Sequence, residues 1–318
     1  MNILITGCAG FIGSALALKI LSCDKTSRVI GLDNLNNFYS PKLKKKRLSF
    51  LKKYKNFKFY KIDLLEKNKL KKLFKDNKID MIFHFAAQAG VRYVKTYPEK
   101  FIESNIYGFH NILNISKLYK IRKFFYASSS SVYGDNNKFP VNEKSNLYPK
   151  NIYGLTKKMN EEYINIFNNQ KTNYIGLRFF TVFGEWGSPD MLILKFLKHA
   201  EKNKNFFLNN SGKHWRDFTY ITDVVNILYK LKSKKINSNK IYNICSNRPI
   251  FIKNLINFLI KKTNFDKIYN VKHDDIEAFK THGKNSVIIK KTGFKKFSDF
   301  YKSVDTTINW YKKYKYLI

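Results

Sequence analysis

Residues 3–21 of this chain, ILITGCAGFIGSALALKIL, decide its fold. An apolar run is followed by glycines at positions 7, 10 and 13 and then by a helical segment from Ser14 to Leu21. In such a turn the first glycine permits a tight bend, the second lets the backbone approach a pyrophosphate, and the third lets the helix pack closely on the strand. The helix N-terminus then faces the anion. The stretch therefore predicts strand, phosphate-binding turn and helix, spaced G-x-x-G-x-x-G rather than the usual G-x-G-x-x-G.

A second apolar run, Val29 to Leu32, ends in Asp33, which lies about 20 residues past the last glycine. A carboxylate at this point can accept hydrogen bonds from both ribose hydroxyls of an adenosine, and it would repel a 2′-phosphate. The sequence therefore predicts NAD rather than NADP as the cofactor. The alternative interpretation is a glycine turn that binds no ligand.

Further apolar runs alternate with amphipathic segments. Strands are expected at 57–61, 81–85, 123–127, 174–177 and 241–245, and helices at 67–74, 99–119, 152–169, 221–231, 252–262 and 300–311. This alternation indicates an α/β protein with a Rossmann-type, doubly wound parallel sheet. The pattern loosens after Arg178, where a smaller C-terminal substrate-binding lobe is expected. We predict an NAD-binding domain over 1–178, with 218–245 returning to it, and a lobe built from 179–217 and 246–318.

The composition is strongly basic, with 60 Lys and Arg against 23 Asp and Glu and a formal net charge of +37. Such a charge suggests a nucleic-acid binder or a membrane-surface protein. Only seven of the basic residues are arginines, however, and recognition of phosphates and bases favours the arginine fork. We interpret the lysines as solvated helix faces and expect no nucleic-acid partner. The densest run, 42–53, is expected to be an exposed loop and helix.

Three cysteines, Cys8, Cys23 and Cys245, form an odd set without metal-ligand spacing. This pattern predicts free thiols in a reducing cytoplasm and no metal site. No stretch resembles a transmembrane span, so no membrane partner is expected, and the first apolar run is interpreted as a strand rather than a leader.

Tyr153 and Lys157 lie one helical turn apart and therefore share a helix face. A free tyrosine has a pKa near 10 and is a poor base at neutral pH, but a neighbouring cation favours its phenolate. Serines 128–131, on a preceding strand, can reach the same point. This combination can take a proton from a sugar hydroxyl while hydride leaves the same carbon. In a chain so rich in Tyr and Lys, the pair could also arise by chance.

Two segments, 106–119 and 161–169, carry apolar residues at helical spacing. Either they pack on the sheet or they form a dimer interface, and the pattern leaves both open; the chain is expected to be a homodimer. The residues concerned are Ile112, Leu113, Ile115, Ile164, Ile166 and Phe167.

With these residues the chain resembles the extended short-chain dehydrogenases/reductases, within them the nucleotide-sugar 4-epimerases and, more narrowly, the UDP-glucuronate 4-epimerases. The resemblance runs from the N-terminus to about Asn247. The matching stretches are DNLN at 33–36, AAQAGVRY at 86–93, SNIYGF at 104–109, ASSSSVYG at 127–134, YGLTK at 153–157, LRFFTVFG at 177–184, RDFTY at 216–220 and YNI at 242–244.

The resemblance implies that NAD stays bound and is recycled. Tyr153 would take the proton from the sugar 4-hydroxyl while C4 gives hydride to the nicotinamide, and the 4-keto sugar would turn over before hydride and proton return. Lys157 would hold the nicotinamide ribose and lower the tyrosine pKa. Ser129 would bond the 4-oxygen, with Ser128 and Ser130 beside it and strand-end capping as their alternative role.

The family motifs also assign the cofactor contacts, which include Asp63 as the adenine contact, with a helix N-cap as its alternative role. The full set implied for NAD is Gly7, Gly10, Phe11, Ile12, Gly13, Asp33, Asn34, Asp63, Leu64, Ala86, Ala87, Gln88 and Lys157.

On the substrate side the resemblance places Arg216 on the UDP diphosphate, where a forked, charge-assisted contact suits arginine. The alternative is a surface salt bridge with Asp217. Arg92 and Thr181 would line the sugar pocket, and Glu277 would reach the uridine ribose. Arg178 could line the pocket too, or it could anchor a buried carboxylate.

Absent residues narrow the chemistry. Nucleotide-sugar 4,6-dehydratases have Asp-Glu after the catalytic Ser/Thr, and UDP-xylose-forming decarboxylases have Glu in the same stretch; here these places hold Ser130 and Ser131. Epimerisation is therefore the expected reaction. One departure concerns the sugar, because the uronate epimerases usually continue Gly-Pro-x-x-Arg-Pro-Asp-Met. Here Ser188 replaces the arginine and Glu185 adds a carboxylate, although Lys195 or a nearby lysine could compensate.

The expected function is an NAD-dependent conversion of UDP-glucuronate to UDP-galacturonate that supplies surface polysaccharide precursors. Two alternatives on the same fold stay open: a 4-epimerase of a neutral or N-acetylated UDP-hexose, and another reaction on a nucleotide sugar. A third, from a different class, is a non-catalytic basic protein that binds nucleotides or nucleic acid.

Overall fold

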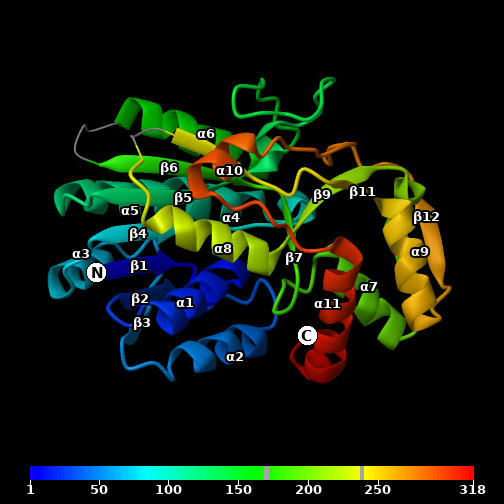
Figure 1. Ribbon diagram of the computed structural model, residues 1–318, viewed down its shortest axis with the longest axis horizontal. Helices are drawn as coiled ribbons and strands as arrows, with labels where there is room; N and C mark the ends of the chain where they lie inside the picture. The colour runs from blue at the N-terminus through cyan, green and yellow to red at the C-terminus, as the bar shows by residue number, and fades with distance from the viewer. Residues whose placement is uncertain (168–171, 237–239) are drawn as a thin grey trace.

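The computed structural model describes residues 1–167, 172–236 and 240–318. Within these ranges, seven parallel strands form the central sheet in the order β10-β6-β5-β4-β1-β2-β3 (Figure 1). The expected doubly wound parallel sheet is confirmed. The strand order reverses between β1 and β4, and such a switch point is where α/β sheets bind ligands. The strands are β1 Asn2–Thr6, β2 Arg28–Asp33, β3 Phe57–Lys61, β4 Met81–His84, β5 Lys123–Ser129, β6 Asn173–Phe179 and β10 Lys240–Ile244.

Helices cover both faces of the sheet because its strands are apolar on both sides, as in most parallel sheets. One face packs on α1 (Phe11–Cys23), α2 (Pro41–Leu51) and α8 (Ile221–Lys232). The other packs on α3 (Lys67–Asp76), α5 (Gly108–Leu118) and α6 (Ile152–Phe167). The helix expected over 99–119 is divided into α4 (Pro98–Ile102), a π-helical turn (Glu103–Tyr107) and α5.

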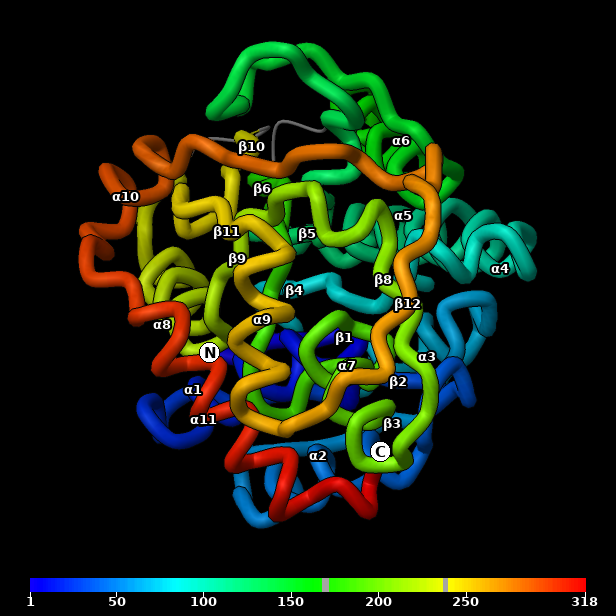
Figure 2. The backbone as a smooth tube through the Cα atoms, turned by 90° about the vertical axis from the view of Figure 1, so that its right-hand side faces the viewer, coloured from blue at the N-terminus to red at the C-terminus, as the bar shows by residue number. Residues whose placement is uncertain are grey.

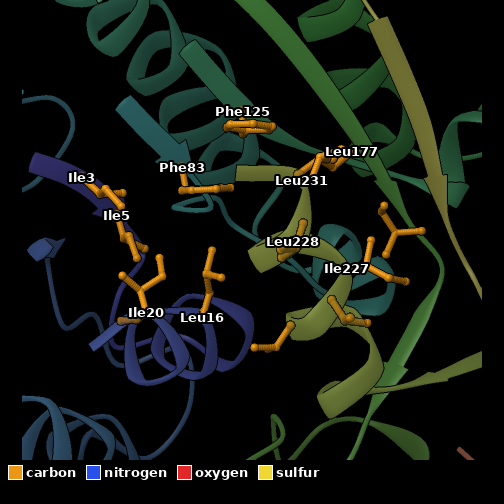
Figure 3. Packing of buried hydrophobic residues seen from close by; sticks show 14 of the residues in the cluster. Ile3, Ile5, Leu16, Ile20, Phe83, Phe125, Leu177, Ile227, Leu228 and Leu231 are labelled. Atoms are coloured by element: carbon orange, nitrogen blue, oxygen red, sulfur yellow. The ribbon is translucent and has the colours of Figure 1, made fainter. Parts of the chain in front are cut away.

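Figure 3 shows the core on the face that α1 and α8 cover. Ile3 and Ile5 of β1 point toward Leu16 and Ile20 of α1. On the neighbouring strands, Phe83 stacks on Phe125 with ring centroids 4.5 Å apart and planes 10° apart, and Leu228 and Leu231 of α8 complete this layer. The first helix is thereby fixed over the first strand, which places the glycine turn at the carboxyl edge of the sheet.

The chain leaves the sheet after β6 and builds a second body on that edge. Its small sheets are ordered β11-β9-β7 and β12-β8, and α7, α9 and α11 pack around a separate core. The segment between β12 and α10 runs across the molecule (Figure 2). The bounds are β7 Thr181–Phe183, α7 Leu192–Glu201, β8 Phe206–Asn209, β9 Trp215–Tyr220, β11 Pro249–Phe251, α9 Ile252–Thr263, β12 Ile268–Val271, α10 Ser286–Thr292 and α11 Phe300–Tyr314.

The division into a domain of 1–178 with 218–245 and a lobe of 179–217 with 246–318 stays a prediction. Helix α10 falls within the predicted lobe, but it packs on α8 and β10 of the large sheet's domain. Its Ile288 belongs to the core beneath the large sheet.

The basic run at 42–53 is not the solvated segment that its composition suggested. It forms α2, in which the side chains of Lys44 and Arg47 are only 5% and 2% exposed. Helical spacing turns Lys44, Arg47 and Leu51 inward, because the helix packs on α1. The buried cations find oxygen partners: Lys44 Nζ donates to the backbone and side-chain oxygens of Asn36 at 2.8 and 2.6 Å.

The apolar residues of the two helices differ in burial, and a dimer interface stays a prediction. Ile112, Leu113, Ile115 and Ile164 are buried in the core, whereas Ile166 is 88% exposed. Throughout the described ranges, no helix is long and apolar enough to cross a membrane.

Candidate functional site

Two adjoining cavities open at the carboxyl edge of the sheet. One, of about 710 Å³, lies over the glycine turn, and the other, of about 880 Å³, lies against β8, β9 and α7. They share Ser130, Ser131, Thr181 and Asp190, so an extended ligand in each could meet the other there. Such a paired cavity suits a dinucleotide beside a second nucleotide-linked molecule.

The glycine turn has no room for side chains. Gly7 has a φ of +70°, and a Cβ there would lie 2.7 Å from the backbone nitrogen of Ala86. A Cβ on Gly13 would lie 2.2 Å from the carbonyl oxygen of Gly7. Helix α1 starts directly after Gly10, so its first N–H groups face the cavity that this turn lines. The cradle fits a pyrophosphate.

All the residues predicted to bind NAD line this smaller cavity. Asp33 ends β2 and accepts hydrogen bonds from the backbone nitrogens of Ala9 (3.0 Å) and Leu35 (2.8 Å). Asn34 Nδ2 donates to Asp63 Oδ2 at 2.7 Å. The alternative role of Asp63 as a helix N-cap is wrong, because α3 starts at Lys67 with Glu66 at its N-cap. The carboxylate of Asp63 instead accepts from the backbone nitrogen of Leu65.

The sequence analysis did not identify Lys44 as a residue of this cavity. Lys44 lines it from α2, and the charge of Asp33 acts on its ammonium. Burial lowers the pKa of Lys44. Its position in a lysine-rich run hid it, since only the helical phase separates Lys44 from its solvated neighbours.

Tyr153, Lys157 and Ser129 line the smaller cavity together, next to Ser130 and Ser131, which both cavities share. Tyr153 lies in the first turn of α6, with Lys157 one turn later; Lys157 Nζ is 5.9 Å from the centroid of the tyrosine ring. The Ser129 side chain lies beside the Tyr153 phenol and acts to lower its pKa. Ser129 Oγ also accepts from the backbone nitrogen of Ser131 at 3.1 Å, which orients its hydroxyl. The predicted catalytic residues thus lie together.

The electrostatics of this group differ from the expectation. Removal of Tyr153 from water raises its pKa above the usual value, and the side chain of Ser129 only partly opposes this. Burial lowers the pKa of Lys157 to about 8. An ammonium 5.9 Å from the ring therefore does not outweigh the desolvation of the phenol in the free protein.

All four serines of the 128–131 run line the smaller cavity, but their hydrogen bonds differ. Ser128 Oγ donates to Glu161 Oε1 at 2.5 Å, and Arg178 binds the same carboxylate. Arg178 thus anchors a buried carboxylate, the second of its two expected roles. Ser130 and Thr181 line both cavities. A substrate contact by Ser128 stays a prediction, although its hydroxyl proton is already engaged.

The larger cavity contains the other predicted substrate residues, Arg92, Arg216 and Glu277. Arg92 Nε lies 2.7 Å from Glu277 Oε1, and Arg216 Nη2 lies 3.1 Å from Glu277 Oε2. The proposed salt bridge of Arg216 with Asp217 is wrong. Asp217 is buried and accepts from Ser246 Oγ at 2.8 Å, and burial raises its pKa to about 6. Glu277 therefore fixes the guanidinium of Arg216 in the wall of the larger cavity.

Two further residues of this cavity, Lys195 and His214, carry no motif. Lys195 lies within the electrostatic reach of Arg92, Asp190 and Glu277, and burial is the main cause of its lowered pKa. Burial lowers the pKa of His214 to about 4, which keeps it neutral. The sequence analysis named Lys195 as a possible compensating cation, whereas no sequence signal indicated His214.

The residues that depart from the uronate-epimerase pattern do different things. Glu185 does not line either cavity, and Tyr220 donates its hydroxyl proton to this carboxylate (2.7 Å). Ser188 faces the smaller cavity and hydrogen-bonds Asp190. Across the described residues, no cluster of three or more His, Cys, Asp or Glu side chains could hold a metal ion.

A Rossmann sheet with a pyrophosphate cradle and a Ser–Tyr–Lys group defines an NAD-dependent enzyme of the extended short-chain dehydrogenase/reductase type. The chain belongs to the NAD dependent epimerase/dehydratase family, whose model matches residues 3–245. This confirms the expected family and the expected cofactor.

Similar proteins cover the whole chain. An uncharacterized protein of Methanocaldococcus jannaschii is 38% identical over 98% of this chain and 96% of its own. UDP-glucuronate 4-epimerase 4 of Arabidopsis thaliana is 33% identical over 99% of this chain and 76% of its own. The crystal structure of UDP-glucuronic acid 4-epimerase from Bacillus cereus in complex with UDP-glucuronic acid and NAD superposes with a TM-score of 0.92 at 28% identity, covering 98% of this chain and 99% of that one.

The glycine cradle leads to a direct test. We expect Gly13→Ala to lose NAD during purification, because its Cβ would lie 2.2 Å from the Gly7 carbonyl oxygen and must push α1 away from the turn. The measurement is NAD released per chain after denaturation, with circular dichroism to verify folding. Leu18→Ala, at an exposed position of the same helix, is the control. Full NAD content in folded Gly13→Ala would contradict this assignment.

Proposed function

We propose that this protein is an NAD-dependent UDP-sugar 4-epimerase that interconverts UDP-glucuronate and UDP-galacturonate. The observation that carries the proposal is the group of Ser129, Tyr153 and Lys157 in the dinucleotide cavity, which adjoins an arginine-lined cavity. Similarity over nearly the full length to plant UDP-glucuronate 4-epimerases and to the Bacillus cereus enzyme supports the choice of reaction and substrate.

The side chains divide the chemistry among them. Bound NAD supplies the acceptor, and later the donor, of the hydride at C4 of the sugar. Tyr153 accepts the proton of the 4-hydroxyl as the ketone forms and returns it when the alcohol is restored, so no net oxidation occurs. Ser129 shares the hydrogen bond to the 4-oxygen, and the ammonium of Lys157 stabilises the phenolate. Arg216 binds the diphosphate while the sugar turns over in the pocket that Arg92 and Thr181 line.

The same cavity disfavours the related reactions. Ser130 and Ser131 line it at the positions where a dehydratase or a decarboxylase would carry an acid. A hydroxyl cannot act as the general acid that removes water across C5–C6 at neutral pH. The 4-keto sugar is therefore left to accept hydride again.

One observation favours a second candidate, a 4-epimerase of a neutral UDP-hexose. Ser188 stands where an arginine was expected, and the Asp190 carboxylate next to it faces both cavities. An acidic group there would repel a C6 carboxylate. Against this, Glu185 is turned to Tyr220, and the cationic Lys195 lies within reach of Asp190. The balance favours the uronate.

We also propose a cytoplasmic location, which the free thiols of Cys8, Cys23 and Cys245 support. We further propose that the protein has no nucleic-acid partner. A UDP-linked sugar is an activated donor, so we propose that the product feeds polysaccharide synthesis. In this proposal residues 1–178 with 218–245 bind NAD, and 179–217 with 246–318 bind the UDP-sugar.

The substrate test is an NMR assay of purified protein with UDP-glucuronate, UDP-glucose or UDP-N-acetylglucosamine, each without added NAD. We expect UDP-glucuronate to convert to its galacto epimer, and Tyr153→Phe to slow this by about 10²–10⁴-fold because the proton acceptor is gone. Tyr316→Phe, at an exposed position, is the control. Turnover of only a neutral sugar would establish the second candidate, and turnover of none would refute both.

The lysine gives a pH test. We expect Lys157→Met to move the rising limb of kcat against pH upward by about one to two pH units, since the phenolate loses its cation. The Lys157 pKa of about 8 sets the pH range of this effect. Below that pH the wild type should be faster than the variant by the full amount, and above it the difference in kcat should shrink because Lys157 becomes neutral. NAD content is measured in parallel. An unshifted limb in NAD-loaded variant would exclude this role of Lys157.

We propose that the exposed apolar side chains of α5, α6 and the turn before α5 form the interface of a homodimer; they are Tyr107, Leu118, Leu155, Met159 and Ile166. Leu155, Met159 and Ile166 follow helical spacing along α6 and present one face. Charge on that face should abolish the association.

We therefore expect Met159→Asp combined with Ile166→Asp to sediment with the mass of one chain, whereas the wild type has twice that mass. Val287→Asp, at an exposed site on α10, is the control. A dimeric double variant would place the interface elsewhere.

A further inference from the structure

A buried ion pair lies directly behind the catalytic serine. Glu161 is on α6, one turn after Lys157, and Arg178 is on β6. The guanidinium of Arg178 donates two hydrogen bonds to the carboxylate of Glu161, from Nε to Oε1 at 2.9 Å and from Nη2 to Oε2 at 2.6 Å. Both side chains are 3% exposed. Ser128 Oγ donates to the same Oε1 at 2.5 Å, so the carboxylate joins β5, β6 and α6.

The network continues from Arg178 toward the substrate side. Arg178 Nη1 donates to the Tyr133 hydroxyl at 2.8 Å, and the guanidinium carbon lies 4.8 Å from that ring's centroid. Tyr133 in turn donates to Asn243 Oδ1 at 2.6 Å. Asn243 Nδ2 lies within hydrogen-bond distance of the carbonyl oxygens of Val141 (3.2 Å) and Lys284 (3.3 Å). One chain of polar contacts thus links the helix of Tyr153 to the loop before it and to the segment that follows β12.

Stability alone does not explain such a pair. Removing two charges from water costs several kcal/mol for each ion, and well-packed apolar residues of similar volume often serve equally well or better. A satisfied buried network does, however, hold its members in one arrangement. This network holds Ser128, whose neighbour Ser129 lines the same cavity as Tyr153.

We propose that Glu161 and Arg178 are positioning residues for the proton transfer, acting through Ser128 on the placement of Ser129 relative to Tyr153. The inference rests on the proposed 4-epimerase function. Glu161 fixes α6 against the end of β5, and Tyr153 and Ser129 come from those two elements. A catalytic hydrogen bond must form within about 2.6–3.2 Å, and a displacement of about 1 Å can cost about 10²-fold in rate. In this proposal Ser128 supports the site rather than contacts the sugar.

The decisive variant replaces both charges, Glu161→Met with Arg178→Met, because a single replacement would leave an unpaired buried charge and destabilise the fold. We expect a folded protein that retains NAD and the wild-type KM, with kcat lowered by about 10²-fold. Ser128→Ala should show the same selective fall in kcat, to a smaller extent. The matched control is Lys232→Met with Asp24→Asn, which removes the ion pair between α8 and the end of α1. It should leave kcat unchanged.

A folded double variant with kcat within about threefold of wild type would overturn the proposal, as would proportional losses of NAD, KM and kcat that indicate general loosening. If the wild type epimerises no UDP-sugar, the function fails separately, and crystal structures of the wild type and the double variant decide the positioning role. A shift of the Ser129–Tyr153 geometry beyond about 0.5 Å supports it, and an unchanged geometry refutes it.

Discussion

The close approach of α1 to the first strand is the constraint on which the rest of this structure depends. Since a Cβ on Gly13 would lie 2.2 Å from the Gly7 carbonyl oxygen, the helix can dock only because a hydrogen occupies that place. Docking brings the helix N-terminus to the carboxyl edge of the sheet, beside Asp33 at the end of β2. The glycine turn therefore lies at the edge of the sheet where β5 ends in Ser129, and Tyr153 lines the same cavity.

Much of the fold could be predicted from the sequence because the pattern of apolar residues that distinguishes strands from helices is local in the chain. The runs at 57–61 and 81–85 match β3 and β4 within a residue, since apolar strands and amphipathic helices differ in period. The errors have a common cause in tertiary packing. The burial of Lys44 and Arg47 depends on α2 meeting α1, and the π-helical turn at Glu103–Tyr107 has no local signal. The lysine-rich composition of 42–53 predicted solvent exposure, but the helical phase of α2 buries the side chains of Lys44 and Arg47.

The site was predictable where family motifs named its residues, and less so where long-range contacts set their state. The cofactor residues gather in one cavity as expected. The tyrosine pKa moved the other way, because enclosure of the phenol is a property of the assembled pocket and not of the Tyr-x-x-x-Lys spacing. The partner of Arg216 is likewise distant in sequence: Glu277, 61 residues away, rather than the adjacent Asp217. Spacing can indicate which residues meet, but not how strongly water is excluded from them.

The arginines show how so basic a chain can be selective. Four of them, Arg47, Arg92, Arg178 and Arg216, use their donors on specific oxygens: Arg47 binds the carbonyls of Ala9 and Gly187, and the other three bind the carboxylates of Glu161 or Glu277. A guanidinium directs several donors in one plane, whereas a lysine is a mobile point charge that remains well hydrated. The lysine excess therefore sets the long-range field, which attracts anionic nucleotides without choosing among them. Of the four, Arg92 and Arg216 line the larger cavity, and the single carboxylate of Glu277 already fixes the orientation of both guanidinium groups.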